Sequence, residues 1–194
     1  YRYTVQKLEK LCTARKTGQE LPEAIQRISD TNALFCYYYA SGRTIDTEEA
    51  VLVTSRSDRY YVSAAFWDRD ALLWAFPCIL EMDRIYAREL LLYVFGRQRR
   101  NFGMHSRYID GTLLEPGFEL DELAAPIHAL TEYCLSTRDT GILAHPFVEE
   151  GIRLVLERLE TYKHPHTDLY ETFLLPSDDE AKYFYVTYDN ALLS

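Results

Sequence analysis

Apolar residues recur every three to four positions along much of the chain, which is the period of one face of an α-helix. This pattern predicts an opening helix that ends before Gly18, with Val5, Leu8 and Leu11 on its apolar face. It also predicts helices over residues 21–28, 68–80, 84–100, 119–135 and 146–159, and a last apolar segment over 185–193. Residues 31–40 fit either the end of a helix or a buried strand.

Two short segments depart from the helical period. Residues 51–54 and 59–62 are rich in β-branched and aromatic side chains, and they predict a small β-hairpin near residues 51–62. Residues 104–117 contain the turn signals Asp110-Gly111 and Glu115-Pro116-Gly117, and they are expected to form a loop. The other predicted helices follow one another in pairs joined by long loops, which is typical of an α/α toroid or solenoid. We therefore expect an all-α fold of antiparallel helical hairpins, in a single domain over residues 1–194.

Acidic residues outnumber basic ones, because 30 Asp and Glu residues face 21 Lys and Arg residues and give a formal charge of −9. Such a surface is a poor partner for nucleic acid or for an anionic membrane, so neither is expected to bind. The 4 cysteines are far apart and form no C-x-x-C pair, which indicates reduced thiols and favours a cytoplasmic setting. None of the 5 histidines lies in an H-E-x-x-H motif, and no metal or other cofactor is expected.

The first candidate for chemistry is the start of the helix predicted over 68–80, where Trp67, Arg69 and Asp70 lie together. A guanidinium and a carboxylate could bind neighbouring hydroxyls of a sugar while an indole covers the apolar face of its ring. Asp70 also has an ordinary structural explanation. A carboxylate at a helix start accepts hydrogen bonds from free backbone N–H groups and meets the positive end of the helix dipole.

Two further loops carry acidic and aromatic residues ahead of a predicted helix. Their candidate substrate-binding residues are Tyr108, Asp110, Glu119, Asp121, Glu122 and Tyr170, and their candidate catalytic residues are Glu171, Asp178 and Asp179. If these loops share one rim with Trp67, several carboxylates converge on an aromatic pocket, as hydrolysis of a glycosidic bond requires. The acids at 119–122 also fit helix-start electrostatics, and residues 177–180 fit a capping box. Glu171 lies among apolar neighbours, an environment that suits a proton donor.

Four segments, in order, resemble the six-hairpin (α/α)6 glycosidases, the clan of glucoamylases, glycogen-debranching glucosidases and metal-independent α-mannosidases. Phe66-Trp67-Asp68-Arg69-Asp70 is similar to their W-x-R-D sugar-binding signature. Asp110-Gly111, followed by Phe118-Glu119-Leu120-Asp121-Glu122, is similar to their second rim loop. Asp168-Leu169-Tyr170-Glu171 resembles the glucoamylase D-L-W-E segment, with Tyr in place of Trp. Pro176-Ser177-Asp178-Asp179 resembles the R-P-S-D-D loop of the α-mannosidases, with Leu175 in place of Arg.

The resemblance implies an exo-acting, inverting glycoside hydrolase that acts on an oligosaccharide or polysaccharide without a metal. In such an enzyme Arg69 and Asp70 would bind the terminal sugar, and Glu171 or Asp179 would protonate the leaving oxygen. The alternative is a non-catalytic carbohydrate-binding or structural α/α module that lacks a complete acid and base pair. A sugar epimerase of related fold ranks below both, because such enzymes use histidines, and no histidine here lies in a convincing rim motif.

Closing a ring of six hairpins takes twelve helices, and a chain of this length has room for about half of them. We therefore expect an incomplete toroid. In the clan that the chain resembles the general base lies in the late hairpins, so the resemblance implies that it falls beyond Ser194 and that these residues alone hydrolyse nothing. An exposed apolar flank is expected where further hairpins would pack. A second copy of the chain could cover part of that flank and form a homo-oligomer.

Overall fold

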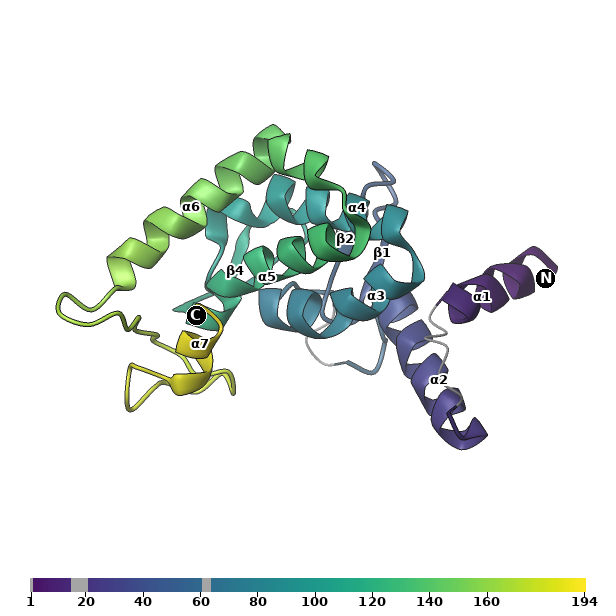
Figure 1. Cartoon of the computed structure of the whole chain (residues 1–194), viewed down its shortest axis with the longest axis horizontal. Coiled ribbons are helices and arrows are strands. Elements are labelled where there is room, and N and C mark those ends of the chain that lie inside the picture. Colours follow the sequence, from purple (N-terminus) through teal and green to yellow (C-terminus); the bar gives the residue numbers. More distant parts are fainter. Residues whose placement is uncertain (1, 15–20, 61–63) are drawn as a thin grey trace.

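The computed structural model describes residues 2–14, 21–60 and 64–194, and most of this part of the chain is helical (Figure 1). The α-helices are α1 (Arg2–Ala14), α2 (Glu23–Tyr39), α3 (Phe76–Met82), α4 (Arg84–Tyr93), α5 (Leu120–Thr137), α6 (Pro146–Tyr162) and α7 (Thr187–Ala191). The π-helical segments η1 (Arg69–Ala75) and η2 (Val94–Gln98) extend α3 and α4, and the 3₁₀ turns are η3 (Arg99–Asn101) and η4 (Thr140–Ala144). The expected all-α class is confirmed, and two small antiparallel sheets accompany the helices.

The centre of the fold is a helical hairpin. Its first arm is η1 followed by α3, and its second arm is α4 followed by η2. Asp83 joins the arms and caps the second one, because its carboxylate accepts a hydrogen bond from the backbone N–H of Tyr86 at 3.0 Å. α5 packs across both arms, and α6 follows α5 through η4 and contacts η2. These elements confirm the helices predicted over 68–80, 84–100, 119–135 and 146–159.

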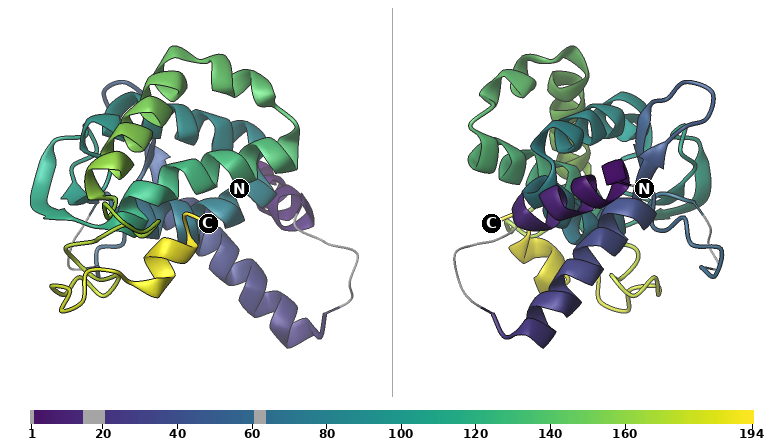
Figure 2. Two further views of the ribbon diagram at one scale, coloured as in Figure 1. Left: turned by 60° about the vertical axis from the view of Figure 1, so that its left-hand side comes forward. Right: turned by 90° about the vertical axis from the view of Figure 1, so that its right-hand side faces the viewer.

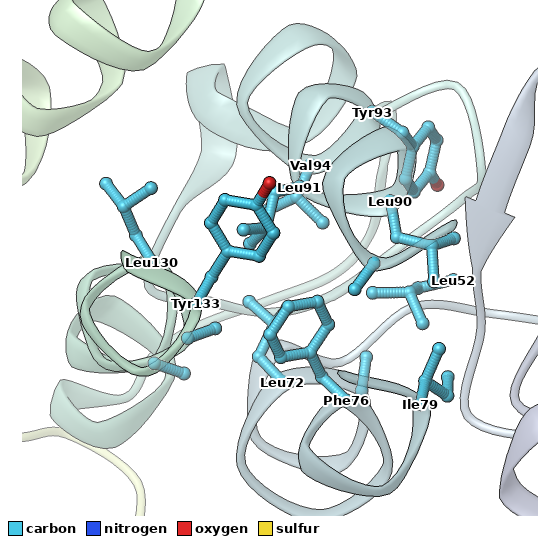
Figure 3. Packing of buried hydrophobic residues seen from close by; sticks show 14 of the residues in the cluster. Leu52, Leu72, Phe76, Ile79, Leu90, Leu91, Tyr93, Val94, Leu130 and Tyr133 are labelled. Atoms are coloured by element: carbon cyan, nitrogen blue, oxygen red, sulfur yellow. The ribbon is translucent and has the colours of Figure 1, made fainter. Parts of the chain in front are cut away.

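Side chains from both arms of the hairpin, from α5 and from residue 52 form the core between these helices (Figure 3). The labelled members are Leu52, Leu72, Phe76, Ile79, Leu90, Leu91, Tyr93, Val94, Leu130 and Tyr133. All of them are buried. Fully burying a Leu, Ile or Phe side chain stabilises a fold by roughly 1.5–3 kcal/mol, so this hairpin and α5 form a firm base for the start of η1.

The prediction of a β-hairpin near residues 51–62 is wrong about which strands pair. β2 (Ala50–Leu52) pairs antiparallel with the upstream strand β1 (Ser41–Arg43), and Ser41 lies opposite Leu52. The end of α2 brings the chain directly beside β2, where the N–H of Val53 donates to the carbonyl of Ala40 at 2.9 Å. Residues 61 and 62 of the predicted second strand lie outside the described residues. The ambiguous stretch at 31–40 belongs to α2 as far as Tyr39.

The predicted loop at 104–117 is instead a second β-hairpin. β3 (Met104–Arg107) pairs antiparallel with β4 (Leu113–Phe118), with register shifts along the pair. The turn signal itself is confirmed, because the carboxylate of Asp110 accepts a hydrogen bond from the N–H of Thr112 at 2.8 Å and Gly111 has a φ of 87°. Pro116 and Gly117 disfavour a strand, which is why the sequence pattern points to a loop.

The two ends of the molecule differ in character. α1 and α2 project at one end, and α7 with residues 163–186 lies at the other (Figures 1 and 2). On α2, Ile25 and Ile28 are exposed by 51% and 59%. Exposed apolar side chains are therefore present, and association of two copies through them stays a prediction.

In the described part of the chain, no helix combines the length and apolar character needed to cross a bilayer.

Candidate functional site

Arg69, the first residue of η1, lies at the centre of a group of carboxylates that we call the Arg69 cluster: Arg69, Glu119, Asp121, Glu122 and Asp178. The Arg69 side chain is only 3% exposed. Its Nη1 donates to Glu119 at 2.5 Å and to Asp121 at 3.0 Å, and its Nη2 donates to Asp178 at 2.7 Å. Oε1 of Glu122 lies 3.7 Å from Nη2. One guanidinium thus joins η1 to the start of α5 and to the C-terminal loop.

The start of η1 is fixed in place by Glu122 as well. Backbone N–H groups in the first turn of a helix have no partner within the helix. Here Oε2 of Glu122 accepts from the N–H of Arg69 at 3.0 Å, and a negative charge at this end of a helix is favourable. Wide π-helical turns such as η1 occur frequently at functional sites.

A second buried ion pair lies next to the first. Arg107 of β3 donates to the carboxylate of Asp68, and both side chains are 0% exposed. The backbones of Phe66 and Arg107 exchange hydrogen bonds of 2.8 and 3.0 Å, so the same two segments are held twice. This pairing fixes β3 against the start of η1 and thereby places Trp67 beside His105.

Trp67 and His105 form the aromatic edge of the site. Their rings meet edge to face with centroids 5.6 Å apart, and Nε1 of Trp67 donates to Nε2 of His105 at 3.4 Å. Nδ1 of His105 is hydrogen-bonded to Glu119, and this bond raises the pKa of the imidazole. A protonated His105 could no longer accept from Trp67, and its Nε2 would instead face the exposed Glu115 at 3.4 Å.

The site contains more acids than its cations can neutralise. Burial raises the pKa of Asp121 and of Glu122, and it raises the pKa of Asp70 to about 6. Burial opposes the charge of Arg69, but the surrounding carboxylates, led by Glu122 and Asp121, outweigh it and raise the pKa of the guanidinium. Arg69 therefore stays charged, and the buried acids around it bind protons more readily than free carboxylates do.

Three of these residues have a spacing that could suit a metal ion. Ligand atoms of His105, Glu119 and Asp178 lie within 4.8 Å of one another. The guanidinium of Arg69 already donates to both of these carboxylates. A fixed positive charge at that position repels a metal cation, so the donor set fits an arginine better than a metal.

The structure brings together seven of the residues predicted for the site. They are Trp67, Arg69, Asp70, Glu119, Asp121, Glu122 and Asp178. Asp70 is partly exposed and close enough to Asp178 to feel its charge. Asp178 is the most open of the carboxylates that bind Arg69, with 55% of its side chain exposed.

The other predicted residues lie elsewhere. Tyr108 and Asp110 are in the turn between β3 and β4. Tyr170 is bound through its backbone to Asn190 of α7, and Asp179 accepts from the hydroxyl of Ser177 at 3.0 Å. Glu171 is exposed and lines a hollow of about 300 Å³ with Tyr162, Phe173 and Phe184. Among the described residues, none of these five predicted residues bonds to the Arg69 cluster, and their expected roles stay predictions.

Sequence reasoning missed four residues that shape the site: Asp68, His105, Arg107 and Asp189. Asp68 lies inside the motif that drew attention to its neighbours, so the motif itself was a usable signal. His105 and Arg107 were hidden because β3 was not expected. Asp189 is a carboxylate in the otherwise largely apolar segment 185–193, and a buried acid there is the kind of exception that calls for an explanation.

Comparison with known proteins adds a relationship in fold. No protein-family model matches the chain, and no curated protein matches it by sequence. A metal-independent α-mannosidase from Streptococcus pneumoniae, solved in a non-productive complex with α-1,6-mannobiose, is similar in structure with a TM-score of 0.71. The similarity covers 97% of this chain and 53% of that chain, at 14% sequence identity. The chain therefore shares the fold of this mannosidase and spans about half of its length.

Proposed function

We propose that the Arg69 cluster is the sugar-binding site of a glycoside hydrolase and that its ligand is a mannose-containing oligosaccharide. One observation carries the proposal: η1, the start of α5 and the loop at Asp178 converge on one guanidinium. The supporting finding is that this convergence occurs in a fold shared with an α-mannosidase that binds α-1,6-mannobiose. A mannose ligand therefore has more support than the glucose polymers of glucoamylases and debranching enzymes.

The exposure of each side chain in and beside the Arg69 cluster indicates its role in sugar binding. Arg69 is enclosed by protein carboxylates, so its part is to hold the acids in position. Asp70 and Asp178 are the more open carboxyls and are the groups that would meet sugar hydroxyls. Trp67 lies beside them, although its side chain is largely covered.

Hydrolysis with inversion requires one carboxylic acid and one carboxylate roughly 6.5–9.5 Å apart, with a water between them. Asp70, whose pKa is raised to about 6 by burial, suits the role of a group that holds a proton near neutral pH. Asp178 is the loop acid that the geometry favours over Glu171 and Asp179, because it reaches the cluster. In this proposal the enzyme is exo-acting and inverting, and its helical hairpins belong to an (α/α)6 toroid.

Isothermal titration calorimetry tests the proposed ligand by comparing the affinity for α-1,6-mannobiose with the affinity for maltose, a glucose disaccharide. Losing a hydrogen bond to a charged group costs about 1.5–3 kcal/mol, so Asp70→Asn and Asp178→Asn should each weaken mannobiose binding roughly 10- to 150-fold. Glu132→Gln changes an exposed acid of α5 and should bind like the wild type. Absence of mannobiose binding, or equal affinity of all variants, would refute the proposed site.

A further inference from the structure

A buried carboxyl, that of Asp189, lies outside the Arg69 cluster. Asp189 of α7 is 0% exposed, and its two carboxylate oxygens have no hydrogen-bond partner among the described residues. Burying an ionised carboxylate without a partner costs far more than burying the neutral acid. The site therefore favours an uncharged Asp189.

The surroundings of Asp189 strengthen this preference. α7 packs against α5. Asp121 of α5 and Glu119 just before it face Asp189 with negative charge, and Arg69 of η1 faces it with positive charge. Arg69 already donates to other carboxylates, so it has little attraction left for another. Tyr188 on the same helix is a further titratable neighbour, with Glu122 and Asp121 also close to it.

The neighbour of Asp189 connects α7 to the loop that carries Asp178. The side-chain oxygen of Asn190 accepts from the backbone N–H of Tyr170 at 2.7 Å, and its amide donates to the carbonyl of Tyr170 at 2.9 Å. Two residues later the hydroxyl of Thr172 accepts from the N–H of Leu120 at 3.1 Å. α7 therefore holds Tyr170 at the start of this loop, whereas Thr172 and Leu174 are bonded directly to Leu120 and Phe118. At the other end of α7, His128 of α5 is hydrogen-bonded to the carbonyl of Leu192 at 2.5 Å.

We propose that Asp189 is a positioning residue whose uncharged carboxyl lets α7 pack on α5, and that its ionisation releases α7 together with Tyr170 at the start of the loop that carries Asp178. As a control over a sugar site this inference rests on the proposed function, whereas the release itself does not depend on any ligand.

The pH range follows from the folded-state pKa. Burial, with the charge of Asp121 added, raises the pKa of Asp189 to about 7. An acid whose pKa is raised by docking favours the docked state at low pH, and this advantage shrinks as pH rises toward the folded-state pKa. The equilibrium constant for docking of α7 on α5 should therefore be about 30-fold lower at pH 8 than at pH 5.5.

Hydrogen exchange of the Tyr170 and Asn190 amides, without any sugar, measures this release. Wild type and Asp189→Asn are compared at the same pH, so that intrinsic exchange rates cancel. Asn is close in shape and cannot ionise. Relative to Asp189→Asn, the wild type should lose about 30-fold in protection between pH 5.5 and pH 8. Glu132→Gln should follow the wild type.

A purely structural role predicts a different result, because Asp189→Asn would then change protection equally at both pH values. That outcome, or parallel behaviour of the two proteins, would overturn the proposal. If Asp189→Asn does not fold, carbon-13 NMR of the aspartate carboxyls in the wild type decides. One aspartate should titrate near pH 7, and titration of every aspartate below about pH 6.5 would overturn the proposal. Failure of mannobiose binding would leave both measurements unaffected.

Discussion

Replacing Arg69 by Gln removes the cation that holds the site together. The wild-type guanidinium donates to Glu119, Asp121 and Asp178, whereas Gln is shorter and uncharged. Three of the surrounding carboxylates, those of Glu119, Asp121 and Glu122, are at most 1% exposed, so water cannot replace the lost partner. The variant leaves buried charges without compensation.

The size of the effect follows from this burial. Removing one partner of a buried ion pair costs about 3–5 kcal/mol. We expect Arg69→Gln to lower the free energy of unfolding by this amount at pH 7, a large share of the roughly 5–15 kcal/mol of a typical domain. The loss should be smaller at pH 5, because acids that lack Arg69 take up protons more readily in the folded state, which offsets part of the cost.

Urea denaturation followed by circular dichroism at pH 7 and pH 5 measures both quantities. Arg153→Gln is the matched control, because Arg153 pairs with Glu157 on the exposed face of α6 and both side chains are 57% exposed. This control should lose no more than about 0.5 kcal/mol. A loss below about 1 kcal/mol for Arg69→Gln at pH 7, or the same loss at both pH values, would refute the buried cluster.

Three further predictions concern the frame and the charge of the site. Gly151→Ala in α6 should lower the free energy of unfolding by about 1–3 kcal/mol in urea denaturation, because the added Cβ would lie too close to Cδ1 of Phe95. Gly→Ala usually stabilises a helix interior, so a gain in stability would contradict this packing. Arg107→Met should lower the free energy of unfolding by about 3–5 kcal/mol, and adding Asp68→Leu should recover part of that loss. A double variant as unstable as Arg107→Met alone would argue against a buried ion pair. Asp70→Asn should raise Tm at pH 7 but not at pH 4, because a pKa raised to about 6 means that ionised Asp70 destabilises the fold only above the unfolded-state pKa. Equal shifts at both pH values would contradict the raised pKa of Asp70.

The helical frame could be predicted from the sequence because its signal is local. Each core helix buries one face, so the apolar period marks α5 and α6 almost to their ends. The pairing of β2 with β1 could not be read in this way. It depends on where the end of α2 delivers the chain, and short strands carry little periodic signal.

The candidate site was predictable as a set of loops but not as a geometry. The motif order places Glu171 and Asp178 in one loop, and sequence alone does not say which side chain turns inward. The structure shows that Thr172 is buried against the N–H of Leu120, which leaves Glu171 outside, whereas Asp178 reaches Arg69. Such choices depend on contacts between segments about 50 to 110 residues apart, which no local pattern contains.

A crystal structure of the protein soaked with α-1,6-mannobiose tests the central claim most directly. The account predicts one sugar ring at the Arg69 cluster, with hydroxyls within hydrogen-bond distance of Asp70 and Asp178 and with Arg69 still bound to Glu119 and Asp121. An empty cluster at a disaccharide concentration that saturates binding in solution, or a sugar bound only at another surface, would contradict it.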